Sequence, residues 1–209
     1  MKIGILISGR GSNMVALVDA VASGEIPDSE VAIVISDQPS AGGLAKAAER
    51  GIETLVIEKN GRKRAEHDAE IVASLRDRGV ELVCLAGYMR LLSPDFVRAF
   101  PNRIVNIHPS LLPSFPGLNV QQQAIDHGVK VSGCTIHFVD EDLDAGPIIL
   151  QRVVEVNDDD TAETLAARIL EQEHGAYVES IRLIVEGRIR VDGRVVKCSI
   201  DQAIDEIRF

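Results

Sequence analysis

The feature that most constrains the fold is a regular alternation of apolar runs and helical patterns through the first half of the chain. Apolar runs typical of strands buried on both faces of a parallel sheet fill residues 2–7, 31–35, 52–57, 80–86 and 103–107. Helical patterns separate them at about residues 13–22, 42–50 and 64–78. This alternation predicts an α/β fold with a Rossmann-like, doubly wound and mostly parallel sheet.

The pattern changes in the second half of the chain. A helix is expected at about 118–127, and two long β runs follow at 130–139 and 147–156, joined by an acidic turn. These runs predict that antiparallel strands extend the parallel sheet. Because no repeat or linker divides the sequence, we expect one domain, with a Rossmann-like, phosphate-binding half at 1–100 and a catalytic and folate-binding half at 101–209.

The last part of the chain predicts a long helix and a small hairpin. The helix is expected to start near Asp160, where Asp160-x-x-Glu163 resembles a capping box, and to run to about Val185. A β pattern then surrounds Asp192-Gly193, a pair typical of tight hairpin turns. The predicted fold is thus a parallel sheet extended by antiparallel strands, with a long C-terminal helix.

The composition narrows the class of partner. The 209 residues carry a formal net charge of −10, which opposes nonspecific attraction to nucleic acid or anionic membranes, so we expect small-molecule partners. No apolar run is long enough to span a bilayer, and no signal peptide precedes the first strand, which predicts a cytoplasmic location. The separated Cys84, Cys134 and Cys198 are expected to be core residues, with no disulfide framework or thiolate metal site.

Two polar residues end the last apolar run of the parallel half. Asn106 and His108 are two positions apart, so in a strand both side chains project to the same face. A fixed amide donor beside an imidazole can hold a developing oxyanion and move a proton. The same pattern also fits a strand end that enters solvent. By itself, the pair therefore leaves both interpretations open.

A glycine-rich loop, residues 8–13 (SGRGSN), stands where the first strand gives way to the first helix. Free amides at a helix N-terminus bind phosphate, although a tight turn with Ser12 or Asn13 as N-cap also fits. Met14 occupies the third glycine position of a dinucleotide fingerprint, and a P-loop lysine is lacking, so a single phosphomonoester is favoured. Asp37 stands where NAD-dependent enzymes hold a ribose, and an oxidoreductase is therefore a rival class.

Two further loops are candidates for ligand contact. Residues 87–92 (GYMRLL) follow the fourth strand, where their apolar side chains either wall a flat ligand or pack on the next helix. Residues 140–147 (DEDLDAGP) imitate a calcium loop, but strands flank them and the EF-hand glycine and glutamate are missing. They fit an acidic turn, from which one carboxylate can also reach the cleft and hold a protonated imidazole.

Glu173 falls on the apolar stripe of the last predicted helix, together with Ile169, Tyr177 and Ile181. A carboxylate in that position needs a partner. Either it is a buried structural acceptor, or the helix edge opens into the cleft and Glu173 meets an amine. No metal is expected, because metal-ligand spacing is lacking at His67, His127, His137 and His174.

Five segments together resemble one family. They are SGRGSN at 8–13, LAGYMRLLSP at 85–94, NIHPSLLPSFPG at 106–117, TIHFVDEDLDAGPII at 135–149 and QEHGAY at 172–177. In this order they resemble the folate-dependent phosphoribosylglycinamide formyltransferases of purine synthesis. The segment from Asn106 to Pro113 is shared across the formyltransferase superfamily, including formyltetrahydrofolate hydrolases and methionyl-tRNA formyltransferase. The first loop and Phe115-Pro116-Gly117 favour the phosphoribosylglycinamide enzymes.

The resemblance implies an activity and a set of site residues. The reaction would transfer the formyl group of 10-formyltetrahydrofolate to the amine of 5-phosphoribosylglycinamide in de novo purine (IMP) biosynthesis, without a metal, in a monomer or homodimer. The implied catalytic residues are Asn106, His108 and Asp144. Ribonucleotide binding is implied for Gly11, Ser12, Asn13 and Glu173. Folate binding is implied for Arg64, Met89, Arg90, Leu91, Leu92, Asn106, Asp140, Glu141 and Asp144.

Two details and two alternatives accompany this resemblance. It suggests a cis peptide bond at Leu112-Pro113, and Asn119 stands where relatives often have histidine. Hydrolysis of formyltetrahydrofolate, or transfer to another amine, is the second function class. A dinucleotide-dependent oxidoreductase is the third.

Overall fold

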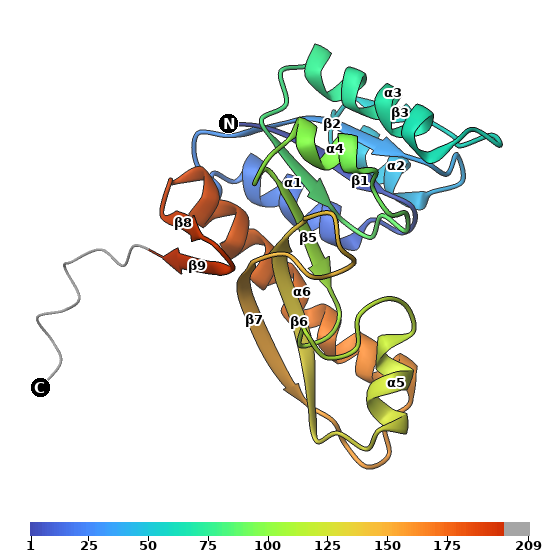
Figure 1. Ribbon diagram of the computed structural model, residues 1–209, viewed down its shortest axis with the longest axis vertical. Coiled ribbons are helices and arrows are strands. Elements are labelled where there is room, and N and C mark those ends of the chain that lie inside the picture. The colour runs from blue at the N-terminus through green and yellow to red at the C-terminus, as the bar shows by residue number, and fades with distance from the viewer. Residues whose placement is uncertain (199–209) are drawn as a thin grey trace, which may run out of the picture.

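A computed structural model describes residues 1–198, which form one nine-stranded sheet in the order β3-β2-β1-β4-β5-β6-β7-β9-β8 (Figure 1). The strands are β1 (Lys2–Ile7), β2 (Glu30–Ser36), β3 (Thr54–Val56), β4 (Leu82–Leu85), β5 (Ile104–His108), β6 (Val131–Phe138), β7 (Ile148–Glu155), β8 (Ile189–Asp192) and β9 (Val195–Cys198). The helices are α1 (Ser12–Ala22), α2 (Gly42–Ala48), α3 (Arg64–Asp77), α4 (Pro94–Ala99), α5 (Val120–Asp126) and α6 (Ala162–Val185).

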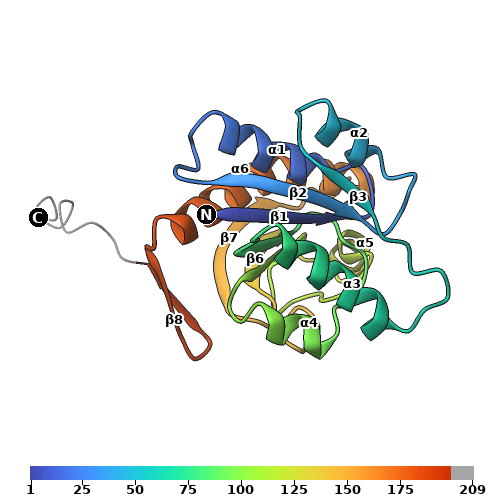
Figure 2. The same cartoon turned by 90° about the horizontal axis from the view of Figure 1, so that it is seen from above.

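The parallel half has the predicted doubly wound architecture. Strands β3, β2, β1, β4 and β5 pair in parallel, and helices cover both faces, with α1, α2 and α6 on one side and α3 and α4 on the other (Figure 2). Successive β1 side chains alternate between two cores, with Ile3 and Ile5 facing α1 and α6, and Leu6 facing α3 and α4. Burial on both faces explains why these strands are continuous apolar runs.

The second half extends the sheet with antiparallel strands, as predicted. β6 pairs antiparallel with β5 and β7, and the β8–β9 hairpin joins β7 through the Ile148–Val195 pair. The prediction of an Asp-Gly turn is wrong. Asp192 pairs with Val195 across the hairpin, so the two-residue turn is Gly193-Arg194. The division of the chain at about residue 100 stays a prediction, and residues 199–209 lie outside the described residues.

The start of α6 also differs from the prediction. The helix begins at Ala162, and its N-cap is Thr161. The Thr161 hydroxyl oxygen accepts from the Thr164 amide, and the Thr161 amide donates to the Thr164 hydroxyl oxygen. Asp160 therefore does not cap the helix. Its carboxylate instead accepts hydrogen bonds from Arg168 (2.7 and 2.9 Å) and from the Thr164 hydroxyl (2.8 Å), which lowers the pKa of Asp160.

Helix α6 packs against both halves of the molecule. It contacts α1 from the parallel half, and β6, β7 and α5 from the second half. Its buried stripe carries Ile169, Tyr177 and Ile181, as the sequence predicted. The Tyr177 hydroxyl is within hydrogen-bond distance of the carbonyl oxygens of Leu85 (3.2 Å), the last residue of β4, and Val105 (3.0 Å), the second residue of β5. The helix thus links the strands that lead into the candidate site.

Three other sequence predictions can be compared with the described residues. Cys84 and Cys134 are buried as expected, whereas Cys198 is exposed on β9, so the prediction of a core position is wrong for Cys198. No helix within residues 1–198 is long and apolar enough to cross a membrane. The same part of the chain holds no group of three or more His, Cys, Asp or Glu side chains suited to a metal ion.

Candidate functional site

The loop after β1 enters α1 through Gly11, the left-handed N-cap of the helix (φ 70°). A Cβ atom added there would lie 2.8 Å from the Gly43 Cα atom, so only glycine fits. The interpretation with Ser12 or Asn13 as N-cap is wrong, because no side chain makes a capping hydrogen bond at this end. The first-turn amides of α1 point out of the helix without a capping side chain, which suits a bound anion.

Asn13 joins this loop to α6. Its Nδ2 atom donates to Glu173 Oε2 at 2.6 Å, and both side chains are buried. Burial raises the pKa of the Glu173 carboxyl group, and the hydrogen bond from Asn13 opposes part of that rise. Asn13 Oδ1 is buried without a hydrogen-bond partner among residues 1–198. The pair therefore presents a carboxylate and an unused acceptor, both suited to a donor such as an amine.

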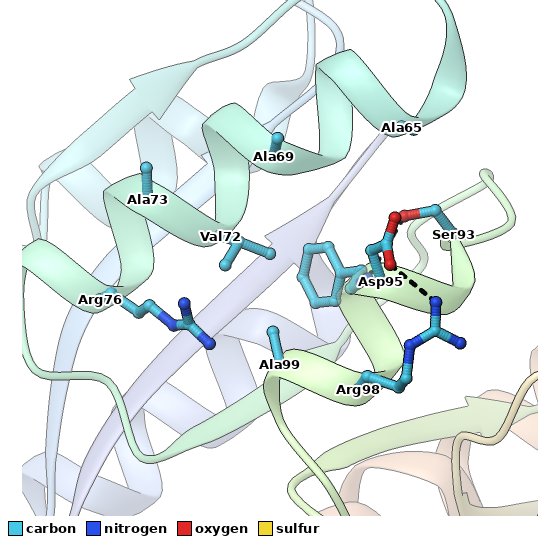
Figure 3. Close-up of a pocket in the computed structure, with 10 residues that line it drawn as sticks. Ala65, Ala69, Val72, Ala73, Arg76, Ser93, Asp95, Arg98 and Ala99 are labelled. Atoms are coloured by element: carbon cyan, nitrogen blue, oxygen red, sulfur yellow. Dashed lines mark hydrogen bonds and ion pairs between the residues drawn. The ribbon is translucent and has the colours of Figure 1, made fainter.

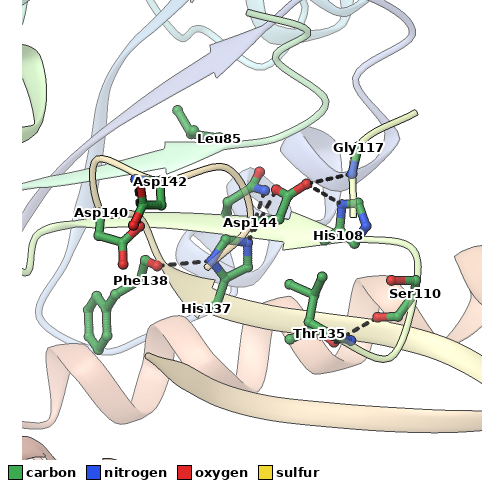
Figure 4. Close-up of polar contacts among 12 residues, drawn as sticks. Leu85, His108, Ser110, Gly117, Thr135, His137, Phe138, Asp140, Asp142 and Asp144 are labelled. Atoms are coloured by element: carbon green, nitrogen blue, oxygen red, sulfur yellow. Dashed lines mark hydrogen bonds and ion pairs between the residues drawn. The ribbon is translucent and has the colours of Figure 1, made fainter. Parts of the chain in front are cut away.

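Asn106 and His108 lie at the carboxyl end of β5, where the structure surrounds His108 with acceptors (Figure 4). His108 Nε2 is 2.9 Å from the Phe115 carbonyl oxygen, and His108 Nδ1 is 3.5 Å from Asp144 Oδ2. The Gly117 amide donates to the same Asp144 oxygen at 2.9 Å. A protonated imidazole would satisfy both acceptors. The strand end is therefore part of a buried polar cluster, and the solvent-facing interpretation is wrong for His108, which is 5% exposed.

His137 belongs to the same cluster and was not predicted as a site residue. It lies directly opposite Asn106 in the β5–β6 pairing. Its Nδ1 is 2.9 Å from the Phe138 carbonyl oxygen and its Nε2 is 3.2 Å from Asn106 Nδ2. Burial lowers the pKa of His137, and a neutral ring protonated on Nδ1 can accept from Asn106 through Nε2. This contact orients the Asn106 amide. The antiparallel register of two predicted strands was the only sequence signal for it.

The loop from Pro109 to Gly117 is held by side chains that sequence reasoning did not single out. Thr135 Oγ1 donates to the Ser110 carbonyl oxygen (2.7 Å) and accepts from the Leu112 amide (3.0 Å). The Ser110 hydroxyl is within hydrogen-bond distance of the carbonyl oxygens of Ser114 (2.6 Å) and Phe115 (3.1 Å). The Leu112-Pro113 bond is cis, as predicted. These bonds fix the carbonyl that faces His108.

The other residues predicted to contact folate occupy separate segments. In the loop after β4, Met89 and Leu91 are 67% and 55% exposed, while Leu92 packs against the core under α3 and α4. Arg90 Nε is buried without a hydrogen-bond partner among the described residues. Arg64 is exposed at the first position of α3. Two exposed apolar side chains beside a buried, unpaired guanidinium nitrogen suit a partly apolar ligand.

The acidic loop between β6 and β7 carries the remaining candidates. Asp144 adopts a left-handed conformation (φ 50°), which aspartate tolerates better than most residues. Asp140 accepts a hydrogen bond from the Asp142 amide (3.1 Å), and Glu141 accepts one from Arg98 of α4 (2.8 Å). Of these carboxylates, Asp144 is the one that the structure places against His108.

The family model described as "Formyl transferase" matches residues 1–181. The chain belongs to the formyl transferase family. Among solved structures, glycinamide ribonucleotide transformylase 1 from Symbiobacterium toebii is 51% identical with a TM-score of 0.93, covering 95% of this chain and 93% of that chain. The phosphoribosylglycinamide formyltransferase of Haemophilus influenzae is 42% identical over 191 residues, which are 91% of this chain and 90% of that relative.

Longer relatives match over a small part of their length. The trifunctional purine biosynthetic protein adenosine-3 of Drosophila melanogaster is 45% identical over 196 residues, which are 93% of this chain and 14% of that protein. The homologous chain from Bos taurus is 45% identical over 199 residues, 19% of its length. The formyl transferase described here therefore corresponds to one segment of those proteins.

In this formyl transferase, the Asp37 side chain is held by a hydrogen bond within the protein. Its Oδ1 accepts a hydrogen bond from the Ser8 hydroxyl (2.6 Å) and its side chain is buried. A carboxylate that binds a ribose must face the ligand crevice with a free oxygen. Met14 is fully buried in the core at the position of the third fingerprint glycine. Both observations, with the family assignment, argue against the oxidoreductase alternative.

A groove of about 510 Å³ lies between α3 and α4 (Figure 3). An Asp95–Arg98 ion pair (2.7 Å) stands beside it, and none of the predicted site residues lines it. Small and apolar side chains form most of its wall, namely Ala65, Ala69, Val72, Ala73, Phe96 and Ala99. The groove is large enough for a small molecule, but it offers few polar groups. The Asn106–His108–Asp144 cluster is the stronger candidate site, because convergent polar groups carry chemistry and an apolar groove does not.

Proposed function

We propose that this formyl transferase transfers the formyl group of 10-formyltetrahydrofolate to the amine of 5-phosphoribosylglycinamide, giving formylglycinamide ribonucleotide and tetrahydrofolate in purine (IMP) biosynthesis. The observation that carries the proposal is the buried contact of His108 with Asp144 (3.5 Å) beside Asn106. An amide and an imidazole that converge in a buried site suit an acyl-transfer reaction. The names of two relatives, covered over 90% and 93% of their length, support formyl transfer with phosphoribosylglycinamide as the acceptor.

The ribonucleotide is proposed to bind at the start of α1. Gly11, Ser12 and Asn13 would surround its phosphate, where backbone amides and the helix dipole favour an anion. Glu173, held by Asn13 at 2.6 Å, would meet the glycinamide amine. Asn13 belongs to the proposed phosphate segment and also contacts Glu173. The two ends of the ribonucleotide would therefore be positioned by connected groups of the protein.

The co-substrate 10-formyltetrahydrofolate is proposed to bind between the loop after β4 and the acidic loop. The exposed apolar side chains of Met89 and Leu91 suit the flat ring of the folate. The proposed contact residues are Arg64, Met89, Arg90, Leu91, Leu92, Asn106, Asp140, Glu141 and Asp144. This proposal places folate binding and catalysis in the second half of the chain, together with Arg64 and the loop after β4, and phosphate binding in the first half.

The chemical step follows from the groups in the cluster. The glycinamide nitrogen attacks the formyl carbon, and the carbonyl π electrons move onto oxygen to form a tetrahedral oxyanion. Asn106 Nδ2 and His108 Nε2 would donate to that oxygen, which displaces the Phe115 carbonyl as the acceptor for His108. The C–N bond to folate then breaks, the carbonyl re-forms, and the proton lost by the amine passes to the folate nitrogen. Asp144 stabilises the protonated imidazole and assists this transfer, and the bound substrates react without a covalent enzyme intermediate.

The partners follow from the same proposal. Both substrates are small molecules, and the net charge of −10 supports the expectation that neither nucleic acid nor an anionic membrane is a partner. We propose no metal requirement, a cytoplasmic location, and a monomer or homodimer.

One assay tests the proposed function. Tetrahydrofolate release from 10-formyltetrahydrofolate is followed with and without 5-phosphoribosylglycinamide, and formylglycinamide ribonucleotide is identified as the second product. We expect release that depends on the acceptor. If tetrahydrofolate is released at the same rate without the acceptor, the protein is a hydrolase. A requirement for added NAD would restore the oxidoreductase alternative.

A further inference from the structure

Ser8, between β1 and the glycine loop, contacts the loop after β4 at two points. Its amide donates to the Gly87 carbonyl oxygen (3.0 Å), and its hydroxyl oxygen accepts a hydrogen bond from the Met89 amide (2.9 Å). Gly87 is left-handed (φ 77°), a conformation that favours glycine and turns the chain back toward β1. The segment proposed to bind phosphate and the segment proposed to bind folate therefore meet at one side chain.

Asp37, directly after β2, orients the Ser8 hydroxyl. Ser8 Oγ donates to Asp37 Oδ1 at 2.6 Å, a charge-assisted hydrogen bond. Because a hydroxyl group has one proton and two lone pairs, donation to Asp37 directs a lone pair at the Met89 amide. Asp37 Oδ2 accepts from Gln38 Nε2 at 3.2 Å, and the Asp37 side chain is 6% exposed. The carboxylate is thus fixed on both sides.

Ser8 follows β1 directly, so its contact with Met89 lies at the edge of the sheet where ligands are expected to bind. Strand order reverses between β1 and β4, and ligands of open α/β sheets bind at such a switch point, where the two following loops separate. Here Ser8 bridges the loops at the point of separation. A change in the position of one loop is therefore transmitted to the other through a direct hydrogen bond.

We propose that Ser8 is a positioning residue that couples the two substrate segments, with Asp37 holding its hydroxyl in the required orientation. The inference rests on the proposed function. Phosphate binding fixes residues 9–13 and Ser8 with them, and Ser8 then fixes residues 89–92 for folate. Each substrate therefore binds more tightly in the presence of the other, and the factor is the same in both directions. Ser8 itself does not touch the reacting atoms.

The test measures binding of tetrahydrofolate, which cannot transfer a formyl group, by calorimetry with and without saturating 5-phosphoribosylglycinamide. In the wild-type protein we expect the ribonucleotide to lower the Kd of tetrahydrofolate. In Ser8→Ala the Kd with ribonucleotide should rise about 5- to 10-fold, as expected for loss of one hydrogen bond, and the two Kd values should become equal. Ser8→Thr keeps the hydroxyl and should restore most of the coupling.

Two further variants make the test specific. Asp37→Asn removes the charge that orients Ser8 and should reduce the coupling about threefold. Ser23→Ala is the matched control. The Ser23 hydroxyl donates to the Ala20 carbonyl oxygen at the other end of α1 (3.1 Å), away from both substrate segments, so the variant should leave both Kd values unchanged. If Ser8→Ala does not fold, as judged by circular dichroism, Asp37→Asn carries the test.

Two results would overturn the proposal: no coupling in the wild-type protein, or wild-type coupling in both Ser8→Ala and Asp37→Asn. Failure of the proposed function is recognised separately, since acceptor-dependent release of tetrahydrofolate by the wild-type protein does not involve these variants.

Discussion

The two halves of the sheet contribute different kinds of group to the candidate site: mainly backbone after β1, and mainly side chains around β5 and β6. After β1, the backbone forms the site, and glycine is required because Gly11 is left-handed and packs against Gly43. Around β5 and β6, side chains form it: Asn106 and His137 contact each other across the two strands, and His108 Nε2 lies 2.9 Å from the Phe115 carbonyl oxygen. The part built on backbone should be most sensitive to replacement of its glycine, whereas the side-chain cluster should be most sensitive to loss of its side chains. Four predictions test this contrast.

His108→Ala should have the largest effect. It removes the proposed donor to the oxyanion and the proposed proton carrier, so kcat should fall about 1000-fold, a typical contribution of a positioned acid–base group. The KM values for both substrates should change only a few-fold, because the side chain acts in the transition state. Steady-state kinetics check this prediction, and near-normal turnover would contradict the catalytic role.

Asp144→Asn should have the second largest effect. Asparagine can still accept from the Gly117 amide, which now donates to Asp144 Oδ2 at 2.9 Å, but it lacks the negative charge beside His108. We expect kcat to fall about 100-fold, since a nearby opposite charge stabilises a protonated imidazole. The pH profile of kcat would show whether the charge matters. A variant with the wild-type rate across the pH range would rule out this role.

Gly11→Ala tests the backbone site. The added Cβ atom would lie 2.8 Å from the Gly43 Cα atom, so the loop must shift, and KM for the ribonucleotide should rise about tenfold, the effect of losing roughly one phosphate hydrogen bond. Gly24→Ala is the matched control. Gly24 is also left-handed (φ 80°), but its surroundings are open. Both variants should lose about 1 kcal/mol of stability from the backbone strain, and only Gly11→Ala should change KM.

His137→Gln should have the smallest effect and concerns pH. Burial lowers the pKa of His137 from its ordinary value of 6.5. As the pH falls below 6.5, the unfolded chain binds a proton that the folded chain does not, so the free energy of unfolding decreases until the folded pKa is reached. His137→Gln removes this contribution. Urea unfolding between about pH 7 and pH 5 should therefore show a smaller loss of stability in the variant, and equal losses would contradict the prediction.

The same contrast explains what the sequence could predict. The parallel strands and the glycine loop are predictable because their signals are local: continuous apolar runs, and glycine at a strand–helix junction. Asn106 and His108 form a local motif too. Their partnership with Asp144 was expected from the family resemblance, and the structure now gives it a geometry.

The missed features depend on hydrogen bonds that the local sequence pattern does not signal. His137 could be assigned only from the antiparallel register that sets it opposite Asn106. The Phe115 carbonyl is a backbone acceptor, and no residue type signals it. Asp160 resembles an N-cap, but Arg168 and Thr164 donate to its carboxylate, and the N-cap is Thr161, one residue later than the motif predicted. In each case tertiary hydrogen bonds decide the outcome.

The long helix α6 has a mechanical consequence. Its 24 residues extend about 36 Å and pack on α1 at one end and on β6, β7 and α5 along the rest. Opening the molecule between its halves would pull Ile169, Tyr177 and Ile181 away from the core and break the bonds of the Tyr177 hydroxyl. Movement of the surface loops avoids that cost. We therefore expect substrates to enter by displacement of the loops after β4 and β6, while α6 keeps its packing against both halves of the molecule.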